Sequence, residues 1–400
     1  MTPILIILLT TLIAAFAVWV VIPVLVLVCY KKNITDAPDY RKLQKRPVPV
    51  LGGLGVYVGT IIALLCSIIL WRLSGGEATI FQLFVPVMIS SIMLYVGLFD
   101  DLIGLRPRTK FIFQILTICL LWAIGGLSIH NFHGLFGVYD VEWYVALPFS
   151  IFVGVGMINA INLIDGVNGL SSGFGILSCV GAGLYFYVHL DYHYALFSFL
   201  FAGALFPFFI YNVFSRKYKI FIGDSGSLVM GTIAYVLVSH ALSYDFSNSP
   251  YYWFDDYVVA LFFALYAIPV VDCLRVMLSR MKHGKSPFNP DKTHLHHYLI
   301  KIGCSHFLTT FAILSLCCGE VLLWLITAAT GMNVDLQFIL VVIFSLLLCV
   351  GVYYYIDFVS QHKPRKALHD YHAVRRFLAK NRNSFYAIQR FIDRKSYGKK

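Results

Sequence analysis

Charged residues are scarce in this chain of 400 residues, where Asp, Glu, Lys and Arg together account for 13% of the positions. A soluble domain usually holds about 25% of such residues. The sequence also has no CxxC pair and no metal-ligand spacing, and its nine Cys residues fall mainly in apolar stretches. These absences exclude a disulfide scaffold and favour Cys as a small buried side chain. No strong internal repeat and no linker divides the chain into separate domains.

Hydrophobic residues, in contrast, make up 59% of the chain, and its mean hydropathy is +0.77. Apolar runs near or above the length that crosses a hydrocarbon core of about 30 Å recur from end to end. We therefore predict an all-α integral membrane protein with about 11 transmembrane helices. The eleven expected helices cover residues 3–29, 50–71, 80–99, 111–129, 145–163, 170–188, 194–214, 225–243, 256–275, 307–329 and 336–357. The first is too long for the apolar core of a signal peptide, so we expect it to remain as a helix.

The basic residues predict the orientation of these helices, because Lys and Arg near helix ends are retained on the cytoplasmic side. If the N-terminus lies outside, in the periplasm, every Lys and Arg except Arg72 falls in a cytoplasmic segment. The C-terminus is then cytoplasmic. The net charge of +11 therefore belongs to one face, where anionic headgroups and phosphorylated ligands explain it better than nucleic acid does.

The expected domain organisation is a membrane domain over residues 1–357 with a cytoplasmic-face site, followed by a basic tail over residues 358–400. Apolar residues recur among the Arg and Lys of the tail. An amphipathic helix on the anionic inner leaflet fits this pattern, and a disordered basic tail fits it equally well.

Acidic residues gather on the predicted cytoplasmic side although basic residues and hydropathy alone defined that side. Asp100 and Asp101 open the segment DDLIGLRPRTK directly after an apolar run. A solvated helix end is one interpretation of this pair. Phosphate oxygens or a divalent cation would use the same mixture of acids and nearby basic residues, Lys110 among them.

Two further polar segments follow apolar runs on the same side. In MINAINLIDGVNGLSSG, residues 157–173, Asn or Asp occurs at every third position and the pattern ends in a turn that contains glycines. Such a turn would hold the polar side chains beside backbone N–H groups that a ligand can approach. A polar helix end with an Asx turn is the alternative. In KIFIGDSGSLVMG, residues 219–231, a Gly-Asp-Ser-Gly-Ser turn opens a helix that could receive an anion while Asp224 faces a metal. A plain helix cap would look similar.

The fourth segment, GKSPFNPDKTHLHHYL over residues 284–299, carries His294, His296 and His297. Zinc is a natural hypothesis, but no Cys partners are present, and His residues beside Lys and Arg also suit a diphosphate. Surface histidines without a role are the remaining interpretation. We expect this loop to be polar and solvent-accessible.

Together the four segments resemble the motif regions of the polyprenyl-phosphate N-acetylhexosamine-1-phosphate transferases, glycosyltransferase family 4, over about residues 36 to 300. The order of the segments and their side of the membrane also agree. HLHH after SPFNPD resembles the branch that transfers N-acetylglucosamine-1-phosphate. Gln44 stands where relatives often have His, which leaves the nucleotide contacts of Lys45 and Arg46 open. Asn212 lies some way before Phe221.

The resemblance implies an enzyme of the bacterial cytoplasmic, or inner, membrane. It would transfer a sugar-1-phosphate, expected here to be GlcNAc-1-phosphate, from a UDP-sugar to undecaprenyl phosphate and release UMP, which starts a cell-surface glycan. The alternatives are the same reaction with another UDP-HexNAc as donor, or with phospho-MurNAc-pentapeptide as the transferred group. The implied cofactor is Mg²⁺, with Mn²⁺ as a substitute. The expected partners are both substrates and membrane lipids, without nucleic acid, and a homodimer is left open.

The resemblance also assigns roles to individual residues. Asp224 is the first expected Mg²⁺ ligand, and Asp100 and Asp101 share the ion or orient the attacking phosphate. A phosphate monoester has a second pKa of about 6 and is mostly dianionic near pH 7. We therefore assign Asp100 to positioning before base catalysis. His294 and His296 are expected to close over the diphosphate as catalytic residues.

The expected substrate-binding residues are those that would line the nucleotide-sugar pocket, contact the uracil or close over the phosphates. They are Lys45, Lys110, Asn162, Asp165, Asn168, Phe221, Arg280 and His297.

A transporter or ion channel is the alternative class, because acids and many spans also suit a permeation path. Transport predicts acids near the middle of spans and interrupted helices in matched halves. Only Glu320 lies deep within an expected span, and the other key acids share one face. The pattern therefore favours the enzyme.

Overall fold

The computed structural model describes residues 2–36, 47–75, 81–244, 256–286, 293–362 and 382–394. Lys45, with its neighbours Gln44 and Arg46, lies outside the described residues, and so does Asp291.

Helices form nearly all of the regular structure, as the sequence predicts. They are α1 (Pro3–Lys32), α2 (Gly52–Leu73), α3 (Phe81–Ile103), α4 (Pro107–Ala123), α5 (Trp143–Leu163), α6 (Leu170–Val188), α7 (Tyr192–Phe214), α8 (Gly223–Ala241), α9 (Val258–Lys282), α10 (Leu295–Lys301), α11 (His306–Ala329), α12 (Val334–Leu346), α13 (Val352–His362) and α15 (Arg382–Asp393). A 3₁₀ turn, Leu135–Gly137, precedes α5, and a π-helical turn, Leu347–Gly351, joins α12 to α13. The sequence did not predict the short antiparallel pair of β1 (Thr35–Asp36) and β2 (Val48–Pro49).

Within the described residues, nine helical segments are long and apolar enough to cross a membrane: α1, α2, α3, α5, α6, α7, α9, α11 and the continuous α12–α13 segment to Tyr355. The protein is thus a multi-pass membrane protein. The other two predicted spans are also helices, but α4 has only 17 residues and α8 carries several polar residues. A high hydropathy is needed where a helix faces lipid. Helix α8 can be more polar because its residues are buried against other helices.

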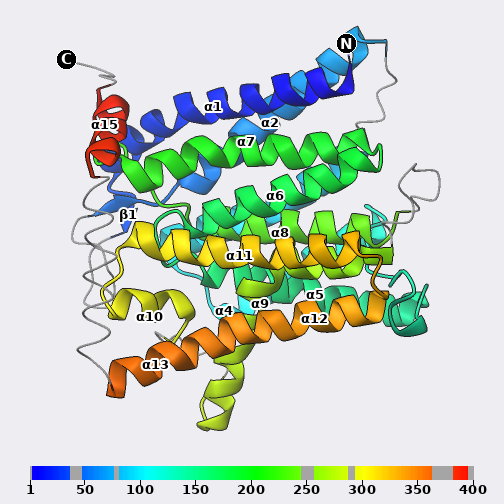
Figure 1. Cartoon of the computed structure of the whole chain (residues 1–400). Coiled ribbons are helices and arrows are strands. Elements are labelled where there is room, and N and C mark those ends of the chain that lie inside the picture. The colour runs from blue at the N-terminus through cyan, green and yellow to red at the C-terminus, as the bar shows by residue number, and fades with distance from the viewer. Residues whose placement is uncertain are drawn as a thin grey trace.

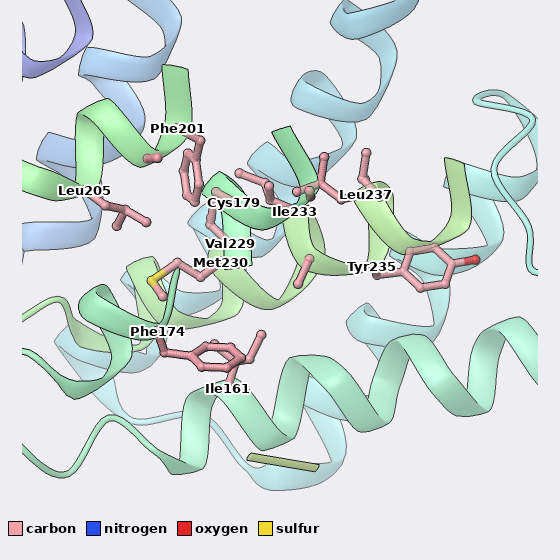
Figure 2. Packing of buried hydrophobic residues seen from close by; sticks show 14 of the residues in the cluster. Ile161, Phe174, Cys179, Phe201, Leu205, Val229, Met230, Ile233, Tyr235 and Leu237 are labelled. Carbon is pink, nitrogen blue, oxygen red and sulfur yellow. The ribbon is translucent and has the colours of Figure 1, made fainter. Parts of the chain in front are cut away.

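Helix α8 lies at the centre of the bundle. Every residue from Ser225 to Ala241 is buried. Figure 2 shows its side chains Val229, Met230 and Ile233 among residues of α5, α6 and α7, including Ile161, Phe174 and Phe201. Because lipid tails are as apolar as these side chains, close van der Waals packing stabilises such a contact more than the hydrophobic effect does.

Glycine allows the surrounding helices to approach α8 closely. A Cβ atom on Gly97 of α3 would lie 2.3 Å from the Cα of Ser225, and one on Gly53 of α2 would lie 2.2 Å from the backbone nitrogen of Gly226. Such distances are far shorter than van der Waals contact. The absence of side chains at these positions therefore brings α2 and α3 against the start of α8.

One end of the bundle collects the polar segments. Figure 1 shows the end of α1, the strand β1, α10 and α15 at this end, on the left. Strand β2 lies beside the segment before α8, since the Phe221 backbone N–H donates to the Pro49 carbonyl at 2.8 Å. We call this the site end.

Two predicted boundaries at the site end are wrong, and the predicted span 111–129 also ends early, at Ala123. Helix α4 begins at Pro107, ahead of the expected residue 111, because proline is favoured in the first turn of a helix. Lys110 therefore lies on the helix and not in the preceding loop. Helix α9 continues to Lys282, beyond the expected residue 275. Arg275 and Arg280 therefore belong to a helix and not to a loop.

Part of the predicted tail is helical. Residues 382–393 form α15, which agrees with the amphipathic alternative for that stretch. Its exposed side chains include Ile388 and Phe391.

We predict that Gly97→Ala destabilises the protein strongly, because the new methyl group would collide with the backbone of α8 and not with a side chain that could move. Gly156→Ala is the matched control, since nothing lies within 4 Å of a Cβ at that exposed position of α5. The midpoint of thermal unfolding can be followed with a thiol-reactive dye that labels buried Cys on unfolding. Equal midpoints for the two variants would show that the α3–α8 approach is looser than described.

Candidate active site

Lys110 joins two carboxylates from distant parts of the chain. Its Nζ donates to Asp100 Oδ2 and to Asp224 Oδ2, each at 2.9 Å. Asp100 lies at the end of α3, Lys110 in the first turn of α4 and Asp224 in the first turn of α8. The side chains of Lys110 and Asp224 are 23% and 28% exposed, so a ligand in water can reach this centre. We call these three residues the Lys110 centre.

The turn between α3 and α4 sets the position of the first acid. Gly104 has a positive φ of 70°, which glycine adopts without strain. The chain then reverses so that the Leu105 backbone N–H donates to Asp100 Oδ1 at 2.6 Å. Asp100 thus has one oxygen bound to its own turn and the other to Lys110.

Asp101 caps helix α8. Its Oδ1 accepts from the Asp224 backbone N–H at 2.8 Å, and its Oδ2 accepts from the Ser225 backbone N–H at 3.0 Å. Gly223 makes this approach possible, because its φ is 70° and a Cβ there would lie 2.5 Å from Asp101 Oδ2. Both oxygens of Asp101 are occupied by free N–H groups at a helix start. Asp101 therefore has a capping role that the sequence did not predict, and its share in a metal site stays a prediction.

Asn162 orients the second acid of the Lys110 centre. Its Nδ2 donates to Asp224 Oδ1 at 3.0 Å and to Ser227 Oγ at 2.8 Å. The sequence indicated Asn162 but not Ser227. Asn159, one turn earlier on α5, instead exchanges hydrogen bonds with Gln114 of α4.

The turn between α5 and α6 holds Asp165 beside the centre. Ser171 Oγ donates to Asp165 Oδ1 at 2.5 Å. Burial raises the pKa of the Asp165 carboxyl to about 8, with further contributions from the charges of Asp224 and Asp101. Asn168 is held through its backbone, because its carbonyl accepts from Thr310 Oγ1 at 2.8 Å and its N–H donates to His306 Nδ1 at 3.4 Å.

Asp272 of α9 organises the His segment, a role that its sequence context did not reveal. His294 Nδ1 and Asp272 Oδ2 are 3.0 Å apart, and Arg275 donates to Asp272 Oδ1 at 2.7 Å. The Leu295 backbone N–H also bonds to this carboxylate. His294 and His296 are 3% and 2% exposed. The expectation of a solvent-accessible loop is therefore wrong for these two residues, because an acid buried in α9 draws the segment inward.

His296 lies against the turn of α5 and α6. A Cβ on Gly166 would lie 2.6 Å from its Nε2, and that nitrogen has no hydrogen-bond partner among the described residues. Burial, followed by the charges of His297 and His294, lowers the pKa of His296 to about 3. The buried Nε2 of His296 is therefore available to exchange a hydrogen bond with a ligand. His296 also lines a cavity of about 20 Å³ with Asp272.

The structure also describes Phe221, His297 and Arg280, which the sequence predicted to bind substrate. The Phe221 ring centroid is 6.0 Å from Lys219 Nζ, and its backbone bonds to Pro49 and Gly52. Burial lowers the pKa of Lys219. His297 is half-buried, with its ring centroid 4.2 Å from that of His296. Arg280 is buried near the end of α9.

Asn212 connects two segments of the backbone through its side-chain amide. Its Oδ1 accepts from the Gly169 backbone N–H at 2.6 Å, and its Nδ2 donates to the Ile220 carbonyl at 2.7 Å. It joins the start of α6 to the segment that leads to Phe221, and it does not point to the Lys110 centre.

The two carboxylates of the Lys110 centre are suitable ligands for a divalent cation. Asp100 and Asp224 already share one positive group, and Mg²⁺ commonly takes one or two carboxylates and completes its shell with water and substrate phosphates. No group of three or more His, Cys, Asp or Glu residues within the described part of the chain could hold a metal by itself. The fit is therefore to a cation that substrate oxygens help to bind.

We predict that Asp101→Ala lowers the stability of the protein by about 1 to 2 kcal/mol, because two N–H groups at the start of α8 lose their acceptor. Glu142→Ala is the control, since this acid also precedes a helix but its side chain makes no capping hydrogen bond. Thermal unfolding of the purified variants gives the comparison. An unchanged midpoint for Asp101→Ala would contradict the capping role.

The chain is similar in sequence to a known family and to several named proteins. The model for glycosyl transferase family 4 matches residues 83–241. An undecaprenyl-phosphate alpha-N-acetylglucosaminyl 1-phosphate transferase of Yersinia pestis is 27% identical over 283 residues, covering 69% of this chain and 72% of the relative. The protein of the same name in Escherichia coli K12 is 26% identical over 69% of this chain and 71% of its own length.

A third relative is more similar in sequence. The decaprenyl-phosphate N-acetylglucosaminephosphotransferase of Mycolicibacterium smegmatis is 31% identical over 287 residues, covering 67% of this chain and 69% of the relative. The matched residues 83–241 include Asp100, Lys110 and Asp224, the three members of the Lys110 centre. This chain therefore belongs to glycosyl transferase family 4.

Proposed function

We propose that the protein transfers GlcNAc-1-phosphate from UDP-GlcNAc to undecaprenyl phosphate, and so forms undecaprenyl-diphosphate-GlcNAc and releases UMP. The names of its relatives support the polyprenyl phosphate acceptor and the sugar. The observation that carries the proposal is the Lys110 centre, where acids and a cation from three helices meet in reach of water. Phosphoryl transfer needs such a centre because its main demand is to neutralise and position phosphate charge.

The proposal includes the orientation and location of the protein. It would lie in the bacterial cytoplasmic membrane with its N-terminus outside, its C-terminus and site end in the cytoplasm, and all eleven predicted helices crossing. The distribution of Lys and Arg supports this orientation. α8 can cross without contacting lipid because neighbouring helices cover it. The prenyl chain of the acceptor would then stay in the bilayer while its phosphate reaches the site end.

The reaction exchanges one phosphorus–oxygen bond for another. An oxygen of undecaprenyl phosphate attacks the sugar-bearing phosphorus of the UDP-sugar. The bond from that phosphorus to the oxygen bridging to the uridine-bearing phosphate breaks, and UMP leaves with the electron pair. The acceptor phosphate is already mostly dianionic near pH 7, so it needs positioning more than it needs a base.

Asp100 and Asp224 would hold the Mg²⁺ ion, or Mn²⁺ in its place. When bound, the ion supplies positive charge that neutralises the phosphate oxygens. Asn162 fixes the orientation of Asp224 through one oxygen, so that its other oxygen faces the cation position. Lys110, which occupies this position between the acids in the structure, would then turn its ammonium group toward a phosphate oxygen.

The other residues would bind and enclose the UDP-sugar. Asp165 and Asn168 lie in the turn beside Asn162 and would contact the sugar nucleotide, while Phe221 would contact the uracil. The Nε2 atoms of His294 and His296, which have no hydrogen-bond partner among the residues that the structure describes, would donate to or accept from the diphosphate. Arg280, His297 and Lys45 are the further binding residues that we propose.

Purified protein incubated with radiolabelled UDP-GlcNAc, undecaprenyl phosphate and Mg²⁺ should form labelled lipid and UMP in equal amounts. A panel of UDP-HexNAc donors, with UDP-MurNAc-pentapeptide included, distinguishes the alternative substrates. Absence of product with every donor, together with solute flux in proteoliposomes, would contradict the proposal and favour a transporter.

We predict that Asp224→Asn lowers turnover by about 100-fold or more while the protein stays folded, because the substitution keeps the size of the side chain and removes its charge from the cation position. Asp140→Asn, an exposed acid away from the site, is the control for the loss of one charge. Turnover is measured over a titration of Mg²⁺ and Mn²⁺, with the unfolding midpoint of the same preparations. Near-normal turnover with an unchanged metal requirement would place the metal elsewhere.

A further inference from the structure

The C-terminal helix α15 is bonded to the segment that leads into the candidate active site. Asp393, in its last turn, accepts three hydrogen bonds from consecutive residues after α7. Ser215 Oγ donates to Asp393 Oδ1 at 2.7 Å, the Lys217 backbone N–H donates to the same oxygen at 3.3 Å, and the Arg216 backbone N–H donates to Oδ2 at 3.3 Å. We call residues 215–222 the α7–α8 segment.

An apolar contact accompanies these hydrogen bonds. The Phe385 ring of α15 lies 5.1 Å from the ring of Phe214 and 6.3 Å from the ring of Phe307, as measured between centroids. Gln389 and Ile392, on the same side of α15, are buried. The opposite side carries the exposed residues Arg390 and Phe391. One face of α15 therefore packs on α7 and α11, and the other is exposed with respect to the described part of the chain.

The α7–α8 segment is held residue by residue from α15 to the Lys110 centre. Ser215 Oγ accepts from the Tyr218 backbone N–H at 2.8 Å, so the hydroxyl that bonds to Asp393 also closes the turn. Asn212 then holds Ile220, and the backbone of Phe221 and Ile222 bonds to the start of α2. The next residues are Gly223 and Asp224. Asp393 thus anchors the first part of a short segment whose last part begins α8.

We infer that α15 is a positioning clamp, in which Asp393 fixes the α7–α8 segment and thereby the placement of Phe221 and Asp224. An anionic carboxylate that accepts from three donors is a strong and directional anchor. Without it, the backbone N–H groups of Arg216 and Lys217 lose these bonds and the start of the segment gains freedom. Asp393 acts through the segment and touches no substrate.

The test combines a readout of the segment with a readout of the reaction, and only the second rests on the proposed function. Trypsin cleaves after Arg216, Lys217 and Lys219, which all lie in the α7–α8 segment. In Asp393→Ala we expect cleavage there to be faster than in the wild type. We expect turnover to fall about 10-fold, since a misplacement of about 1 Å at a site can cost about 100-fold and the later bonds of the segment limit the displacement. Asp393→Asn, which keeps one acceptor oxygen, should be intermediate in both measurements.

Two further variants make the outcome specific. Arg390→Ala also removes a charge from α15, but on its exposed face, and should change neither measurement. Ser215→Ala combined with Asp393→Ala should lower turnover by less than the sum of the two single effects, because both remove the Ser215–Asp393 bond, although Ser215→Ala also removes the bond from the Tyr218 backbone N–H. If Asp393→Ala does not fold, the comparison rests on Asp393→Asn and Ser215→Ala.

The possible results separate the two proposals. Faster cleavage with reduced turnover supports the clamp. Faster cleavage with unchanged turnover would overturn positioning, and unchanged cleavage would overturn the docking of α15. If the wild type forms no labelled lipid, the proposed function fails, while the cleavage comparison still decides whether Asp393 holds the segment.

Discussion

Two carboxylates and one ammonium group, brought together from three helices, are the interaction on which the site depends. Asp100 and Asp224 would repel each other if nothing stood between them, and Lys110 separates them at hydrogen-bond distance from both. For this to happen, α3, α4 and α8 must begin or end within a few ångströms of one another. Gly97 brings α3 onto α8, Asp101 caps α8 from α3, and Pro107 starts α4 where Lys110 can turn back. The chemistry of the Lys110 centre therefore depends directly on how these helices pack.

The membrane explains why the centre lies at the end of the bundle. Charged groups are costly in the hydrocarbon core, whereas the site end offers water to Lys110 and Asp224. A polar helix such as α8 is tolerated because other helices surround it completely. This arrangement lets one helix carry buried packing residues along its length and an exposed acid in its first turn. A hydrophobic acceptor chain and a charged phosphate would meet the protein at the boundary between these two environments.

The sequence predicted the helical membrane class, the gathering of Asp100 and Asp224 on one face, and the tight turn at Gly223, because these follow from local composition and from the placement of basic residues. It did not predict the capping role of Asp101, whose partners lie more than a hundred residues away along the chain. It also missed Asp272, which looks like an ordinary acid near a helix end but buries His294 and the start of α10. Such roles depend on contacts between helices, and hydropathy and motif spacing carry little information about them.

The most direct test of this account is the binding of Mn²⁺ to the purified protein, measured by electron paramagnetic resonance in the presence of UDP, without any turnover. The account predicts one bound ion in the wild type, markedly weaker binding in Asp224→Asn and in Asp100→Asn, and little change in Asp101→Asn, whose carboxylate caps α8. Equal binding by the wild type and by both the Asp100 and Asp224 variants would contradict the central claim, because the cation position would then lie outside the Lys110 centre.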